Sequence, residues 1–228
     1  MRIGLAGIPG SGKTELALAL KKQFESEGSS VVVIDDYVPK IEKDTNLALG
    51  FSASYAGNIH VALGRAAEER KLVENPPDFT ITCGTLFETS SYMAQNFEAE
   101  YSLLLRDDDK YNFAQRSEAT MRIMACFYID LVKYDHIFHL TPIHASDDDN
   151  LAKLEGNLQA AFEAFNLFEH NLLETEGSNE NEITENRIKK VLEKINADNS
   201  KEQSVQVKES DGSGVRSGSE DGEEQATA

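Results

Sequence analysis

The strongest constraint on the fold is a glycine-rich motif close to the N-terminus. The pattern G-x-x-x-x-G-K-[ST] is filled at every position by Gly7, Ile8, Pro9, Gly10, Ser11, Gly12, Lys13 and Thr14. A short apolar run, residues 1–6, precedes the motif, and residues 13–24 follow it with apolar side chains spaced for one helix face. This order predicts a buried strand, a glycine loop and a helix.

The residue types in this motif suit a polyphosphate. Glycines allow backbone N–H groups to approach phosphate oxygens closely, and the helix that follows adds the positive end of its dipole. In the pattern, the lysine, here Lys13, contacts the β- and γ-phosphates, and the hydroxyl of Thr14 binds Mg²⁺. Ser11 offers another hydroxyl. The motif therefore predicts a site for ATP and Mg²⁺; an ordinary glycine-rich turn is the alternative.

Composition narrows the class of protein. The chain has 228 residues, of which 40% are hydrophobic, and no apolar run is long enough to cross a membrane. Cys83 and Cys126 lie far apart in apolar segments, which indicates reduced thiols of a cytoplasmic protein, and the immediate first strand leaves no room for a signal peptide. The formal net charge of −18 disfavours a nucleic acid partner.

Strands and helices alternate along the chain, which predicts an α/β fold with a mainly parallel, doubly wound sheet in three layers. Four strands are expected, at residues 1–6, 31–35, 79–83 and 136–140. A fifth is suggested only weakly, by Val205 and Val207. Helices are expected at residues 13–24, 58–72, 92–105 and 117–133, and a last one runs from Ser146 or Asp147 through Leu172.

The C-terminal quarter differs in composition from the rest. Residues 174–228 hold fourteen acidic and seven basic residues and are rich in Asn, Ser and Gly. We therefore expect a nucleotide-binding domain over residues 1–173 and a largely disordered acidic tail over 174–228. One short helix is expected at residues 183–195. Truncation after Glu174 is expected to leave nucleotide binding intact.

With these elements, residues 1–173 resemble the P-loop kinase-like ATP-binding proteins. These are often labelled AAA-domain proteins, lie close to nucleoside and nucleotide kinases, and are frequent in viral genomes. The glycine motif carries most of the resemblance, and the segments at residues 35–37, 83–89 and 134–140 add to it. The resemblance implies transfer of a phosphoryl group from ATP, with Mg²⁺, to a nucleotide-like acceptor.

The resemblance also implies roles for two acids. Asp35 ends the second strand, where similar kinases place the acid that orients or deprotonates the acceptor hydroxyl; Asp36 is its alternate. A pair of turn-forming aspartates is the other interpretation. The third strand ends in Cys83-Gly84 in place of the usual metal-binding aspartate. Glu88 is the best substitute in the metal's shell, unless it is a surface acid or helix cap.

Transfer of a phosphoryl group also needs positive charge, usually from arginines on a lid after the fourth strand. Residues 143–150 contain none. We expect the remaining candidates to be solvated surface charges; they are Arg65, Arg70, Arg106 and Arg116.

Three functions stay open at this point. The first is a small kinase with a nucleoside, nucleotide or modified base as acceptor, bound between residues 37 and 75. The second is an ATPase that drives a protein partner, which the acidic tail and the missing lid arginines favour. The third is a nucleotide-binding protein with little catalysis.

Overall fold

The computed structural model describes residues 1–35, 55–101, 119, 134–144, 148–164 and 171–211. The chain divides into two compact units, Met1–Lys190 and Val191–Ala228. The first unit runs past the boundary expected at residue 173. In the second, helix α7 (Glu180–Asp211) continues from Val191 to Asp211, with Lys194 Nζ 3.4 Å from Asp198 Oδ2 one turn away.

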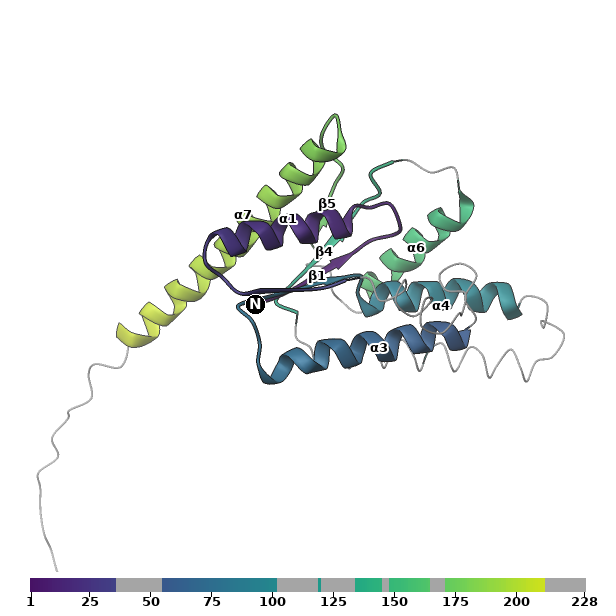
Figure 1. Cartoon of the computed structure of the whole chain (residues 1–228), viewed down its shortest axis with the longest axis horizontal. Coiled ribbons are helices and arrows are strands. Elements are labelled where there is room, and N and C mark those ends of the chain that lie inside the picture. The colour runs from purple at the N-terminus through teal and green to yellow at the C-terminus, as the bar shows by residue number, and fades with distance from the viewer. Residues whose placement is uncertain (36–54, 102–118, 120–133, 145–147, 165–170, 212–228) are drawn as a thin grey trace, which may run out of the picture. The chain divides into compact units, whose positions relative to one another are not determined.

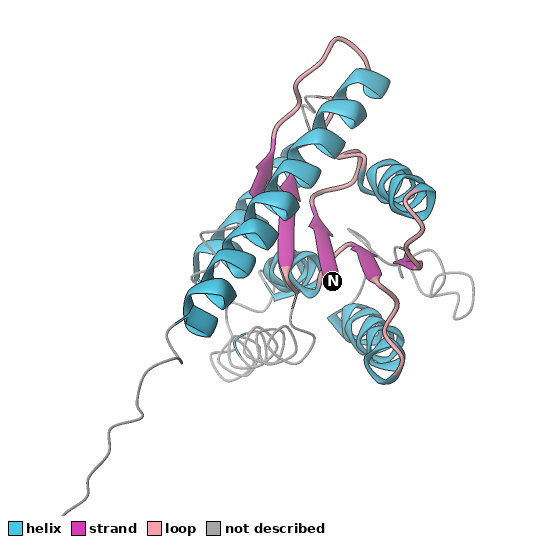
Figure 2. Ribbon diagram, turned by 90° about the vertical axis from the view of Figure 1, so that its left-hand side faces the viewer, coloured by secondary structure: helices cyan, strands magenta, loops and turns pink. Residues whose placement is uncertain are grey.

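A five-stranded parallel sheet forms the centre of the first unit (Figures 1 and 2). Its order is β2-β3-β1-β4-β5, so the first strand is central, between β3 and β4. The strands are β1 (Arg2–Ala6), β2 (Val31–Ile34), β3 (Phe79–Cys83), β4 (His136–Leu140) and β5 (Asn171–Leu173). The predicted α/β fold and its first four strands are confirmed.

The fifth strand was predicted wrongly. Val205 and Val207 lie within helix α7, and the strand is formed instead by Asn171–Leu173, beside β4. Leu172 had been placed at the end of the last predicted helix, because it continues that helix's apolar spacing. A strand of three residues is too short to show the two-residue periodicity that identifies a strand.

Helices flank the sheet on both sides. In Figure 1, α1 (Lys13–Ser26) lies on one side of the strands, and α3 (Tyr55–Glu74) and α4 (Leu86–Tyr101) lie on the other, where α6 (Asp149–Ala164) packs against α4. Helix α4 begins six residues before the predicted Tyr92, directly after β3. The helix predicted at residues 117–133 falls outside the described residues, apart from helical Ala119.

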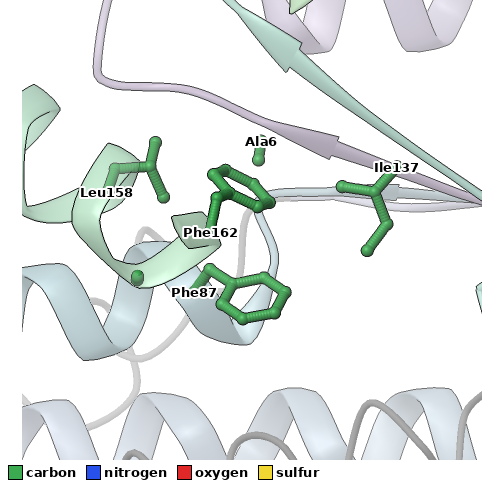
Figure 3. Packing of buried hydrophobic residues seen from close by; sticks show 6 residues of the cluster. Ala6, Phe87, Ile137, Leu158 and Phe162 are labelled. Atoms are coloured by element: carbon green, nitrogen blue, oxygen red, sulfur yellow. The ribbon is translucent and has the colours of Figure 1, made fainter. Parts of the chain in front are cut away.

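The start of α4 is fixed by a buried apolar cluster that joins four elements (Figure 3). Phe87 of α4 packs against Phe162 of α6, with ring centroids 4.9 Å apart. The cluster consists of Ala6, Phe87, Ile137, Leu158, Ala161 and Phe162. Burial of its two phenylalanine rings contributes several kcal/mol of hydrophobic stabilisation. This packing holds the first turn of α4 next to the end of β1.

Candidate nucleotide-binding site

The glycine loop joins β1 to α1 in a conformation that its glycines make possible. Gly10 and Gly12 both have a φ of 80°, in the left-handed region that favours glycine. Gly12 caps α1, and the amide N–H of Leu16 donates to its carbonyl at 3.0 Å. A β-carbon on Gly12 would lie 2.8 Å from Ile143 Cδ1. The positive φ therefore favours glycine at this position, and a larger residue would also displace the end of the Ile143 side chain.

Gly7 is needed for close packing inside the loop. A β-carbon at Gly7 would lie 2.6 Å from Ser11 Oγ and 2.7 Å from the carbonyl oxygen of Leu140. Ser11 is fully buried, and among the described residues no hydrogen-bond partner reaches its Oγ. A buried hydroxyl without a partner costs about 1–3 kcal/mol. An added oxygen ligand in the loop, such as a phosphate oxygen, would satisfy it.

Lys13 folds back over the loop that precedes it. Its Nζ donates to the carbonyl oxygen of Gly7 at 2.6 Å and to that of Ile8 at 3.1 Å. The same ammonium lies 3.1 Å from Glu88 Oε1, and both side chains are only 11% exposed. Lys13 therefore carries its charge into the loop, where the motif places a polyphosphate.

Glu88 connects the loop to the end of β3. Its Oε1 accepts the amide N–H of Gly7 at 3.2 Å, and its Oε2 accepts that of Thr85 at 2.6 Å. The residue sits in the first turn of α4, where the helix dipole favours a carboxylate. The sequence selected Glu88 as the nearest acid after β3, and the structure places it in contact with Lys13.

The other residues of the predicted loop also lie at the carboxyl end of β1. Thr14 is half-buried in the first turn of α1, Ile8 is buried and Pro9 is exposed. The backbone of Gly10 is tied to the segment after β4, because the amide N–H of Ile143 donates to its carbonyl at 3.2 Å. Strand, loop and helix together reproduce the arrangement that the motif requires.

Comparisons with known proteins agree with this geometry. The family described as "Chromatin associated protein KTI12" matches residues 1–52. Among solved structures, NadR protein in complex with NAD and AMP-PNP is similar with a TM-score of 0.60 at 13% identity, covering 84% of this chain and 48% of that one. The chain thus spans about half the length of NadR. Among curated proteins, none matches the sequence significantly.

Two smaller proteins are similar over nearly their whole length. Thymidylate kinase from Ehrlichia chaffeensis has a TM-score of 0.52 at 15% identity, over 86% of this chain and 98% of its own. Deoxyadenosine kinase from M. mycoides, with products dCMP and dCDP bound, has a TM-score of 0.51 at 14% identity. The match covers 86% of this chain and 100% of that one. The chain has the P-loop kinase-like fold.

Within this P-loop fold, Asp35 lies at the carboxyl ends of the strands, as the loop does, but it is not beside the loop. It follows Ile34, the last residue of β2, and is exposed. Because β3 separates β2 from β1, Asp35 stands two strand spacings from the loop, roughly 10 Å across the sheet. Its alternate, Asp36, is outside the described residues.

Arg65 was expected on the surface, and this expectation is wrong. The side chain is only 1% exposed and donates from Nη1 to the carbonyl of Thr85 at 2.9 Å. A β-carbon on Gly84 would lie 2.8 Å from Glu88 Oε2 and 2.9 Å from Arg65 Nη2, so carboxylate and guanidinium flank this glycine. Periodicity placed Arg65 on a helix, but it could not show that α3 turns this face toward the end of β3.

A buried acid compensates the charge of Arg65. Glu69 lies one turn further along α3, and Tyr134 Oη donates to its Oε1 at 2.6 Å. Burial raises the pKa of Glu69, while the Tyr134 hydrogen bond and the Arg65 charge lower it again. Arg65 therefore belongs to a structural network. Arg70 is exposed as expected, and Arg106 and Arg116 lie outside the described residues.

Sequence reasoning missed one arginine at the P-loop. Arg187 of α7 is 2% exposed, and its Nη1 donates to the carbonyl of Ser11 at 2.5 Å. A signal was available, since Arg187 shares a spacing of four residues with Ile183, Val191 and Ile195 and so lies on the apolar face of its helix. It was overlooked because residues 174–228 were taken as a tail.

Within the part of the chain that the structure describes, protein groups alone do not form a metal centre. The described residues contain no cluster of three or more His, Cys, Asp or Glu side chains able to hold an ion. Mg²⁺ in nucleotide sites typically takes only one or two protein oxygens and completes its shell with phosphates and water. Thr14 and Glu88 are oxygen donors of the required kind, and their metal role stays a prediction. None of the helices described is long and apolar enough to cross a membrane.

Proposed function

We propose that this chain is a kinase that transfers the γ-phosphate of Mg-ATP to a nucleoside, a nucleotide or a modified base. The observation that carries the proposal is the P-loop with Lys13 inside it, bonded to Gly7 and Ile8 and 3.1 Å from Glu88. A largely buried ammonium in a glycine loop at a helix N-terminus is suited to a polyphosphate.

The similar structures support a nucleotide-like acceptor. Two of the three are kinases of nucleosides or nucleotides, and the third, NadR, holds NAD and AMP-PNP. Asp35 would serve as the acid that orients or deprotonates the acceptor hydroxyl. Its distance of roughly two strand spacings from the loop leaves room for a γ-phosphate and a hydroxyl between them.

The test is ADP release from Mg-ATP by the purified full-length chain. We would measure it alone and with a panel of nucleosides, nucleoside monophosphates and short oligonucleotides. A rise in ADP release with one acceptor supports the kinase and identifies its substrate. ATP binding with turnover that no acceptor changes would contradict the kinase and favour an ATPase acting on a protein partner.

Glu88 offers a separate test of the metal site. Glu88→Gln keeps the side chain's size but places an amide group where Gly7, Thr85 and Lys13 now meet carboxylate oxygens. We expect a loss of stability of about 1–3 kcal/mol. We also expect a smaller gain in ATP-analogue affinity when Mg²⁺ replaces EDTA, as measured by titration calorimetry.

Glu163→Gln is the matched control for this change. Glu163 is exposed on α6 and accepts a hydrogen bond only from Gln159 Nε2, at 3.3 Å, among the described residues. The control should match the wild type in both measurements. A Glu88→Gln protein that is destabilised but keeps the full Mg²⁺ effect would assign Glu88 a structural role only.

A further inference from the structure

Arg187 contacts the P-loop from the side of the loop's carbonyl groups. Its Nη1 donates to Ser11 O at 2.5 Å and lies 3.5 Å from the position that a β-carbon would take on Gly12. The guanidinium therefore bonds to Ser11 and lies close to Gly12. It comes from residues 180–190 of α7, which belong to the same compact unit as the loop.

The same guanidinium joins the loop to the ends of two strands. Nη2 donates to Thr141 O at 2.7 Å, after β4, and to Leu173 O at 3.3 Å, at the end of β5. Further bonds reach Thr175 Oγ1 and Glu174 O, each at 3.4 Å. Since a guanidinium is a rigid planar fork, these partners fix its orientation toward Ser11.

Holding the carbonyl of Ser11 also orients the amide that follows it. In a trans peptide the C=O and the next N–H point in opposite directions, and none of the described residues has a cis peptide bond. With the Ser11 carbonyl turned toward Arg187, the N–H of Gly12 points away from Arg187. In a P-loop, amides of this stretch are the ones that face the phosphates.

No carboxylate of the described residues balances the charge of Arg187. Its acceptors are four backbone carbonyls and one hydroxyl, and among the described residues no carboxylate forms an ion pair with it. Arg65 differs, because the carboxylate of Glu69 offsets its positive charge. A buried cation without a counter-ion is costly, and burial lowers the pKa of Arg187. A polyphosphate bound across the loop would supply the missing negative charge.

We propose that Arg187 is a positioning residue of the nucleotide site. It turns the Gly12 amide toward the phosphates and places a positive charge behind the loop. This inference rests on the proposed binding of ATP and extends the site to residues 171–187. It reverses the expectation that the chain after Glu174 is dispensable for nucleotide binding.

The test compares affinities for a fluorescent ATP analogue in full-length variants at a temperature where circular dichroism shows them folded. Arg187→Met should weaken binding about tenfold or more, because it removes the charge and the bonds to the loop. Arg187→Lys keeps the positive charge but lacks the planar set of guanidinium donors, so it should recover part of the lost affinity. Lys190→Met, three residues away and paired with Glu176 at 2.8 Å, should bind as the wild type does.

A second measurement uses the unmodified chain and does not depend on how the variants fold. Hydrogen exchange with and without Mg-ATP should show added protection both in residues 7–14 and in residues 180–190. Protection of the loop alone, or a folded Arg187→Met protein with unchanged affinity, would overturn the role of Arg187 while leaving the proposed function standing. Failure of the wild type to bind ATP would overturn both.

Discussion

We expect Lys13→Ala to abolish measurable binding of a labelled ATP analogue. The substitution removes the ammonium that lies against Gly7 O, Ile8 O and Glu88 Oε1. Charge-assisted hydrogen bonds to two phosphates are lost with it, so we expect affinity to fall by about 100-fold or more. Fluorescence anisotropy with purified protein measures this directly.

Two further variants make this result interpretable. Lys13→Met fills the space of the lysine stem without its charge and should bind as poorly as Lys13→Ala, with a smaller loss of stability. Lys22→Ala, an exposed lysine of the same helix, should leave binding unchanged. Tight binding by a folded Lys13→Met protein would refute the assignment of the loop as the phosphate site.

We expect Asp35→Asn to remove the proposed phosphoryl transfer and to leave ATP binding intact. The amide keeps the shape of the side chain but cannot take a proton from the acceptor, which costs about 10²–10⁴-fold in rate when the acid is a general base. Because Asp35 lies two strands from the loop, the ATP-analogue affinity should stay within about twofold of the wild type. Acceptor-dependent ADP release is the readout.

The same assay includes two more variants, Asp36→Asn for the alternative acid and Asp149→Asn as a control. Asp149 is exposed at the start of α6, and its substitution should change neither binding nor transfer. If Asp36→Asn stops transfer while Asp35→Asn retains it, the catalytic role passes to Asp36. Full transfer by both proteins would exclude an acid at the end of β2 from the chemistry.

The central part of the fold was predictable because its signals are local. Four strands of four or five mostly apolar residues and one complete glycine motif specify four of the sheet's five strands and the loop. The place of Glu88 was also predictable in outline, since β1 and β3 are neighbours and their ends meet. Its bond to Gly7 could not be predicted, because it depends on the packing of Phe87 against Phe162.

The wrong predictions concern features of the structure that tertiary packing determines. A three-residue edge strand leaves no periodic signal, and Asn171–Leu173 is stabilised by its pairing with β4. Arg65 was taken as a surface charge because arginine is seldom buried, and Arg187 was not considered because it lies in the segment taken as a tail. In each case backbone carbonyls at strand ends provide the acceptors that make burial possible, and sequence spacing does not reveal them.

The bond between Arg187 and Ser11 also bears on how the protein is made. It links positions 176 residues apart, so the loop emerges from the ribosome well before Arg187 does. Contacts this distant in sequence form slowly, since a long stretch of chain must be ordered first. The nascent chain would therefore hold the loop without its bond to Arg187 until α7 has been made and has folded.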